Sequence, residues 1–399
     1  MRFKNWPRRF ATVYATSLLS AGLAWPQAPH PKKAVPAIAL VDPADAPQWQ
    51  SLVESAGWQL IAGPADANTN IDQRLQALAA KVAESVKAGA ADASRIYLAG
   101  RGDAAPFVFY DISRMPDRWT AGVALGGSPK GAIDTNRIFA VNFTATPVLW
   151  ASNGANDSDY AERLKLAGLN IEWRSSTGLN NRAVLDWLAA HVRAEHPLTA
   201  DCETNSPAFA SCFWVQPQKF DPAERNDVLP MTLIPGDSGT KLDLGGFGYR
   251  ADDPGPGVTV AFLPLKYDGP LKAGDRLEAL DGKPIDNARQ LMQILEKTES
   301  TRYAVVMVRR GKDRMRVETR IVVPHRDPVV TARVKAEYMP DYHQIVLISR
   351  AITEMNVTLP PEWIPGDLLW NGLTIENVKT PGCYALKLEK ELLHAGPCQ

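Results

Sequence analysis

The sequence predicts a multi-domain chain in which an α/β domain with a parallel sheet is followed by β-rich domains. Short apolar runs alternate with helical segments from Ala37 to His196, which is the pattern of βαβ units. That periodicity stops between Glu195 and Gly239, where prolines and two cysteines gather. Beyond Gly239 the chain consists of short alternating segments separated by turn residues, which is typical of β structure.

The length and the charge of the chain limit its class. At 399 residues it is too long for one typical core, since domains usually have roughly 100 to 200 residues. The 44 basic and 44 acidic residues cancel, so nucleic-acid binding has no electrostatic support, and no long run of like charge indicates a membrane surface. We expect two or three folded domains and no nucleic-acid partner.

Residues 1–28 have the features of a secretory signal. Basic residues in Met1–Arg9 precede an apolar stretch, Phe10–Trp25, that is too short for a comfortable membrane span. Small residues up to Ala28 offer cleavage points, and no later segment has 18 uninterrupted apolar residues. We expect an exported, periplasmic or extracellular protein without a span after the signal; an uncleaved anchor is the alternative.

The first domain is expected at residues 35–197. Ile71–Lys87 carries leucines and valines at helical spacing, which predicts that one face lies on the sheet. Tyr160–Ala167 and Arg182–Val192 predict helices as well. The predicted strands are Ala37–Val41, Trp58–Ala62, Arg95–Ala99, Ala121–Leu125, Pro147–Ala151 and Asn170–Arg174.

A strand that turns sharply at glycines into a helix, Arg95–Ala105, stands in the middle of this domain. About 150 residues around it resemble the α/β-hydrolase family, in which a Gly-x-Ser-x-Gly elbow presents the catalytic serine above the sheet. Here Gly100 takes the place of the first glycine, Gly102 stands where the serine should be, and Ala104 replaces the last glycine. Because glycine has no side chain, the resemblance implies this fold without its nucleophile.

Of the other catalytic positions of the resembled family, this sequence has a residue for the acid but none for the histidine. Asp157 stands where the acid is expected, whereas the loop Ser175–Asn181, where the histidine should fall, contains none. The loop Val41–Asp45, expected to form the oxyanion hole, lacks the usual glycines. Since a nucleophile and its base work as a unit, the sequence predicts a degenerate, non-catalytic serine hydrolase.

Two more residues are weak catalytic candidates beside Asp157. Ser128 follows a strand but lies past the elbow, where a turn of small residues is the simpler interpretation. Asp103 would project from the elbow turn, although negative charge beside the first helical turn is favourable by itself. The alternative to a non-catalytic domain is an envelope esterase or peptidase that uses Asp103, Ser128 and Asp157 with a relocated or atypical nucleophile.

Four cysteines in an exported chain predict two disulfides. Cys202 lies ten residues from Cys212, and Cys383 lies fifteen from Cys398, so the simplest of three connectivities pairs neighbours. Each bridge closes a short loop, worth about 3 kcal/mol in the chain-entropy model. No Cys-x-x-Cys occurs and no histidine lies near either pair at ligand spacing, so we expect neither a metal nor another cofactor.

The most specific motifs lie in residues 240–324. Gly245–Tyr249 resembles the Gly-Leu-Gly-Phe loop of PDZ domains, and Gly269–Ile285 resembles the PDZ core signature. Gly274-Asp275 would make the turn into a strand, and Asp281-Gly282 would make a tight hairpin. The resemblance implies a PDZ-like β-barrel module.

A PDZ-like module implies a groove that binds a peptide or a protein C-terminus. The bare backbone of the loop would hold the terminal carboxylate, and the predicted helix Asn287–Lys297 would form one wall. A groove filled by another segment of this chain is the alternative. The expected binding residues are Gly245, Gly246, Phe247, Gly248, Leu291 and Leu295.

The remaining residues complete the expected division of the chain. Residues 198–239, with Cys202 and Cys212, are expected to be an interdomain segment. Residues 325–399 are expected to form a small β domain with a tight turn at Asn371-Gly372 and a core that includes Trp363, Leu368, Leu369 and Trp370. The sequence as a whole predicts an exported PDZ scaffold with a degenerate hydrolase domain.

Overall fold

The computed structural model describes residues 33–64, 70–236, 239–250, 253–264, 266–324, 329–389 and 392–398. The predicted signal, residues 1–28, lies outside the described residues. No helix in the described part of the chain is long and apolar enough to cross a membrane.

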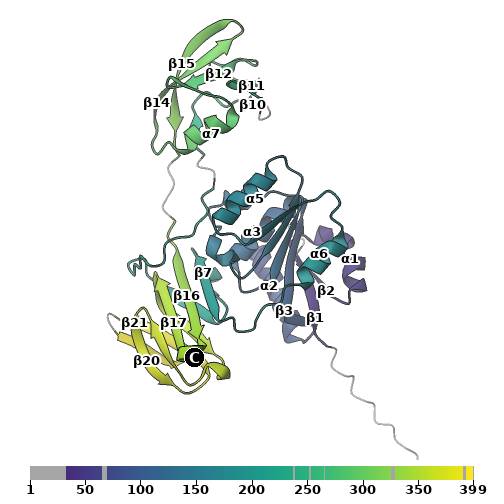
Figure 1. Cartoon of the computed structure of the whole chain (residues 1–399), viewed down its shortest axis with the longest axis vertical. Helices are drawn as coiled ribbons and strands as arrows, with labels where there is room; N and C mark the ends of the chain where they lie inside the picture. Colours follow the sequence, from purple (N-terminus) through teal and green to yellow (C-terminus); the bar gives the residue numbers. More distant parts are fainter. Residues whose placement is uncertain are drawn as a thin grey trace, which may run out of the picture. The chain divides into compact units, whose positions relative to one another are not determined.

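The first domain contains a parallel sheet with helices on both faces (Figure 1). Its strands are β1 (Val35–Leu40), β2 (Gln59–Ala62), β3 (Ala91–Arg101), β4 (Ala121–Leu125), β5 (Val148–Ser152) and β6 (Ile171–Ser175), in the order β2-β1-β3-β4-β5-β6. Its helices are α1 (Ala46–Ser55), α2 (Ile71–Lys87), α3 (Ala105–Arg114), α4 (Lys130–Ile133), α5 (Asp157–Leu166) and α6 (Asn181–Ala189). The predicted parallel α/β sheet is confirmed.

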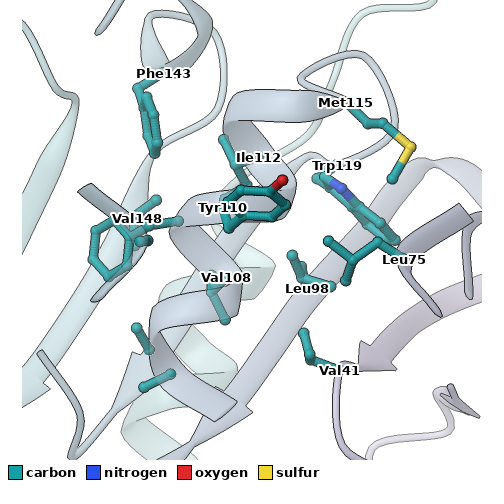
Figure 2. Close-up of a cluster of buried hydrophobic side chains, with 14 of the residues drawn as sticks. Val41, Leu75, Leu98, Val108, Tyr110, Ile112, Met115, Trp119, Phe143 and Val148 are labelled. Carbon is teal, nitrogen blue, oxygen red and sulfur yellow. The ribbon is translucent and has the colours of Figure 1, made fainter. Parts of the chain in front are cut away.

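The central strands β4 and β5 of this sheet are almost wholly apolar because both faces are covered. Every residue of β4 and β5 is buried, as expected for a parallel sheet between two helical layers. On one face α1 and α6 contribute Trp49 and Leu188 to the core. On the other face α2 and α3 contribute Leu75 and Val108 to a second apolar cluster, shown in Figure 2. Burial on this scale is the main stabilising term of the domain.

A second domain consists of two packed sheets. One has the order β20-β19-β17-β16-β7 and the other β22-β21-β18-β8, and side chains of both share one core. The turn at Asn371-Gly372 is confirmed, with φ of 48° and 87°, as a type I′ hairpin requires. The strands are β7 (Thr199–Thr204), β8 (Val215–Phe220), β16 (Ala332–Met339), β17 (Gln344–Arg350), β18 (Ile352–Leu359), β19 (Gly366–Trp370), β20 (Leu373–Val378), β21 (Gly382–Glu389) and β22 (Leu392–Pro397).

The segment 198–239 differs from our expectation of an interdomain connection. It supplies β7, which pairs with β16, and β8, which pairs with β18. β7 lacks the usual alternation because it buries a charged residue, Glu203, and β8 contains Pro217, a residue that argues against a strand in a sequence. The correction is that residues 199–204 and 215–220 are strands of the two-sheet domain, whereas Phe209 and Ile234 of the same segment pack in the core of the first domain. In the C-terminal part Trp363, Leu368 and Trp370 are buried as expected, and Leu369 is half-buried.

Both predicted disulfides are present. Cys202–Cys212 joins β7 to the loop three residues before β8, with a Cα–Cα distance of 5.9 Å. Cys383–Cys398 joins β21 to the residue that follows β22, with a Cα–Cα distance of 5.4 Å. Within the described residues no group of three or more His, Cys, Asp or Glu side chains could hold a metal ion.

Residues 241–322 form a module, named here the inserted module, between two strands of the two-sheet domain, β8 and β16. Its helix α7 (Ala288–Glu296) begins after Asn287, whose Oδ1 accepts from Gln290 N at 3.0 Å. The predicted tight hairpin at Asp281-Gly282 is present, and the φ values of its two residues are positive, 51° and 77°. The strands are β9 (Lys241–Leu242), β10 (Gly248–Tyr249), β11 (Val258–Phe262), β12 (Arg276–Leu280), β13 (Lys283–Pro284), β14 (Arg302–Arg310) and β15 (Asp313–Val322).

Candidate functional site

A groove of about 430 Å³ lies between α7 and the loop that joins β9 to β10. Its apolar walls come from Phe247 in the loop and from Leu291, Met292 and Leu295 on α7. Leu291 and Leu295 are only 2% and 4% exposed, so they are fixed by the core while still bordering the groove. Tyr249 of β10 also lines it.

The loop at this groove presents unpaired backbone donors. Within the described residues, the N–H groups of Gly245, Gly246 and Phe247 make no hydrogen bond to a backbone or side-chain acceptor. Gly245 and Gly246 have φ of 77° and 75°, a conformation that residues with a Cβ rarely adopt. Successive free N–H groups in such a turn form a concavity suited to an anion.

The charge around the groove also favours an anion. Lys241 lines the groove, is exposed, and forms no ion pair with an acid of the described residues. Asp243 lines the groove too, but its Oδ2 lies 3.0 Å from Arg320 Nη2, which balances its charge. The groove therefore combines apolar walls with a cationic group and free amide donors.

Tyr267 supports the loop from behind. Its hydroxyl donates to the carbonyl of Leu244 at 2.6 Å and accepts from the N–H of Leu271 at 3.1 Å. A Cβ on Gly245 would lie 3.0 Å from the Tyr267 ring, so the loop rests directly on that ring. This contact is a second reason for glycine at position 245.

The strand that follows the loop is an edge strand. In the order β10-β11-β12-β14-β15-β9, β10 stands at the end, so one of its sides has no partner strand among the described residues. An edge of this kind can accept an added strand.

The structure brings together five of the six expected groove residues. Gly245, Gly246, Phe247, Leu291 and Leu295 all line the groove. The sixth, Gly248, lies beside it in β10 and pairs with Phe262 of β11.

Sequence reasoning missed four residues of this site: Tyr249, Lys241, Met292 and Tyr267. Tyr249 could have been found, because it stands two residues from Phe247 and strand side chains alternate in direction. Tyr267 had no local signal, because it contacts a loop more than twenty residues earlier in the chain.

The turn expected to resemble a nucleophile elbow joins β3 to α3. Gly102 has a φ of 56°, and a Cβ built on it meets nothing within 4 Å. A Cβ on Gly100 would lie 2.5 Å from the carbonyl oxygen of Ala104, so strand and helix approach too closely for a side chain there. The backbone is sharply turned at Gly102, and no side chain is presented from it.

The three weak catalytic candidates lie near the same end of the sheet without forming a catalytic set. Ser128 Oγ accepts from Lys130 N at 3.3 Å, and Asp157 Oδ2 accepts from Gly154 N at 2.9 Å, so each closes its own turn. Ser128 and Asp157 border one depression. Asp103 is exposed and does not border it.

A buried carboxyl group stands beside the elbow. Asp45 Oδ2 accepts from the N–H of Arg101 at 3.0 Å. Burial raises the pKa of this carboxyl, and the Arg101 amide lowers it in part. This hydrogen bond ties the loop after β1 to the end of β3.

Two described histidines, His191 and His196, fall within residues 35–197. His196 Nδ1 lies 3.8 Å from Glu362 Oε1 of the two-sheet domain, so His191 is the histidine nearer the parallel sheet. It follows α6 and lies beside the start of β3, where Arg193 N donates to Ser94 O at 2.9 Å. Its Nδ1 is 2.9 Å from Trp187 O. Since Gly102 follows the other end of β3, His191 cannot act as a base at the elbow.

No protein-family model matches the chain, and no curated protein matches it either. Among solved structures, it is similar in part to a thermostable esterase at 15% identity and a TM-score of 0.31, over 42% of this chain and 58% of that one. A bacterial heroin esterase gives 11% identity and a TM-score of 0.30, over 41% and 75%.

An HtrA-type protease solved with a decapeptide gives 23% identity and a TM-score of 0.17, over 22% of this chain and 30% of that one. The chain thus spans less than two thirds of the thermostable esterase and of the protease. Likenesses this distant say nothing about the activity or ligand of this chain.

Proposed function

We propose that the protein is an exported binding protein in which residues 240–324 form a PDZ-like module for a peptide or protein C-terminus. In this proposal residues 35–197 are a hydrolase-like platform without catalytic activity. One observation carries the proposal: the free loop N–H groups, the apolar groove and the unpaired edge strand β10 lie next to one another.

Each part of a C-terminal peptide has a counterpart in this arrangement. The main chain would pair with β10, which has a free side. The terminal carboxylate would accept from the N–H groups of Gly245, Gly246 and Phe247, with Lys241 adding positive charge. The last side chain would enter between Phe247 and Leu295. Main-chain pairing supplies affinity, and the groove supplies selectivity.

The test compares two glycine variants that should strain the backbone equally. Gly246→Glu places a carboxylate in the loop, whereas Gly282→Glu places one in the β12–β13 hairpin. The two glycines have φ values of 75° and 77°, and a Cβ would meet nothing within 4 Å at either position. We expect Gly246→Glu to weaken binding of fluorescent C-terminal peptides by about ten-fold or more, because like charges repel in the groove. Gly282→Glu should bind like the wild type.

The readout is fluorescence anisotropy with peptides that carry either a free or an amidated C-terminus. Thermal unfolding of both variants checks that they are folded. Equal binding by Gly246→Glu and the wild type, or equal binding of free and amidated peptides, would exclude the carboxylate site.

Export is the second part of the proposal. The two disulfides are typical of proteins from oxidising compartments. We expect the mature protein in the cell envelope or outside it to lack residues 1–28, which N-terminal sequencing of the purified native protein would establish. Recovery of the protein from the cytoplasm with four cysteine thiols that react with an alkylating reagent would contradict export.

A second candidate function is an esterase or peptidase with a relocated nucleophile. It is supported by the left-handed turn at Gly102 and by the depression that Ser128 shares with Asp157. Under this alternative the purified protein would hydrolyse p-nitrophenyl acetate and would be labelled by a fluorophosphonate at Ser128. Our proposal expects neither, with Ser128→Ala as the control for background hydrolysis.

A further inference from the structure

Phe262 is an exposed aromatic residue next to the proposed binding edge. It lies on β11 and is 63% exposed, which is unusual for a phenylalanine in a folded module. It pairs with Gly248 of the edge strand β10. A Cβ built on Gly248 would lie 3.2 Å from Phe262 Cβ and 3.7 Å from Phe262 Cδ1, so the aromatic side chain covers the space above this glycine.

The alternation of strand side chains determines what a bound peptide would place beside Phe262. Phe247 and Tyr249 both line the groove, so Gly248 between them faces the opposite side of β10. In a strand paired with β10, the last and third-last side chains would enter the groove. The penultimate side chain would therefore point to the Gly248 side of β10. Because glycine has no side chain, Phe262 forms the surface at that position.

We propose that Phe262 is a specificity-determining residue that contacts the penultimate side chain of the bound C-terminus and favours an apolar or aromatic residue there. This inference rests on the proposed function. The occupant is a peptide carboxyl terminus because the loop before β10 has free N–H groups and Lys241 of β9 lines the same groove, and both complement a carboxylate. Neighbouring side chains across strands attract one another when both are apolar or aromatic.

The experiment uses a peptide series in the full-length protein. The probes are fluorescein-labelled peptides Gly-Ser-Gly-Ser-Val-X-Val with a free carboxylate, in which X is Phe, Leu, Ser or Asp. We expect the wild type to bind the Phe and Leu peptides about two- to five-fold more tightly than the Ser peptide, which is the size of a cross-strand apolar contact. Phe262→Ala should remove this preference and leave the affinity for the Ser peptide unchanged.

The matched control is Tyr303→Ala, which removes an aromatic side chain of the same module that is 84% exposed on β14. It should keep the wild-type preference. A preference that survives in Phe262→Ala would overturn the inference while leaving the carboxylate site intact. Failure of every free-carboxylate peptide to bind, or equal binding of amidated ones, would overturn the proposed function and the inference with it.

Pairing of two copies through β10 is the competing use of this edge. Sedimentation velocity of the peptide-free protein tests it. We expect a monomer at micromolar concentration, and a dimer that Phe262→Ala dissociates would assign this surface to self-association and overturn the inference.

Discussion

The hydroxyl of Tyr267 joins two parts of the inserted module, since it donates to Leu244 and accepts from Leu271. Tyr267→Phe keeps the ring beneath Gly245 but removes both hydrogen bonds, so the loop should persist with less order. A hydrogen bond contributes about 1 kcal/mol net, so we expect a similar loss of folding free energy and about five-fold weaker peptide binding. Urea unfolding and anisotropy measure the two effects.

The control for this change is Tyr303→Phe, which removes a hydroxyl from an exposed side chain of the same module. Tyr303→Phe should change neither the unfolding free energy nor the peptide affinity. Unchanged peptide binding by Tyr267→Phe would show that the loop does not depend on this hydroxyl.

Asp111 is a fully buried carboxyl group in α3. Its Oδ1 accepts from Trp119 Nε1 at 3.2 Å, and its Oδ2 has no hydrogen-bond partner among the described residues. Burial raises the pKa of Asp111 well above its ordinary value. The folded state therefore keeps a proton on Asp111 that the unfolded chain releases above about pH 4. Because the folded state binds the extra proton, the free energy of unfolding falls as the pH rises from about 4 toward the pKa of Asp111 in the folded state.

Asp111→Asn removes this proton linkage while keeping the size of the side chain. We expect the variant and the wild type to have similar stability at about pH 4, and the variant to gain relative stability as the pH rises toward 8. Urea unfolding free energies across this range provide the measurement. Parallel pH profiles for the two proteins would show that the carboxyl is already ionised in the folded state.

At the scale of elements, the β3–α3 turn is bent sharply at Gly102 and presents no side chain from that position. The close approach of Gly100 to Ala104 and the positive φ of Gly102 are backbone properties. A serine at position 102 has room for its Cβ but must adopt the left-handed conformation, which costs about 1–2 kcal/mol.

Gly102→Ser therefore should fold with a modest loss of stability and should not hydrolyse p-nitrophenyl acetate. The reason is that His191 lies beside the other end of β3, and His196 lies beside Glu362 of the two-sheet domain. A serine needs a base within hydrogen-bond reach. Turnover that appears in Gly102→Ser and vanishes on phosphonate labelling would reveal a catalytic base other than His191 and His196.

At the scale of the molecule, Glu203 connects segments that are far apart in the sequence. Its backbone N–H donates to Asn142 Oδ1, and its carbonyl accepts from Asn142 Nδ2, both at 2.8 Å. Its Oε2 accepts from Thr232 N and Oγ1 at 2.7 Å, and its Oε1 accepts from Thr331 and from Arg350 Nη2. Thr232 and Thr331 flank the inserted module, so one carboxylate holds both of its attachment points.

Glu203→Ala leaves the guanidinium of Arg350 without its carboxylate in a partly buried position. We expect a loss of about 3 kcal/mol in unfolding free energy, as for other broken buried pairs. Peptide affinity should stay unchanged, because the groove residues come from the inserted module alone. The exposed Glu376→Ala on β20 is the control and should cost close to nothing. A loss below 1 kcal/mol would contradict the role assigned to Glu203.

The sequence by itself determined the features that depend on neighbouring residues. Hydrophobic periodicity placed α2 and the strands of the parallel sheet within one or two residues, except that β3 begins earlier. Asn371-Gly372 and Asp281-Gly282 predicted their hairpins because few residues tolerate positive φ, and the cysteine spacing predicted both disulfides.

Only the tertiary structure decided which distant segments meet. It assigned β7 and β8 to the two-sheet domain, placed Tyr267 beneath the loop, and laid Phe262 over Gly248. These contacts join residues fourteen to more than a hundred positions apart, and their energy comes from packing and hydrogen bonds that exist only in the folded chain. A local pattern cannot encode them, because the buried polar residues of β7 are stable there only through partners such as Asn142 and Arg350.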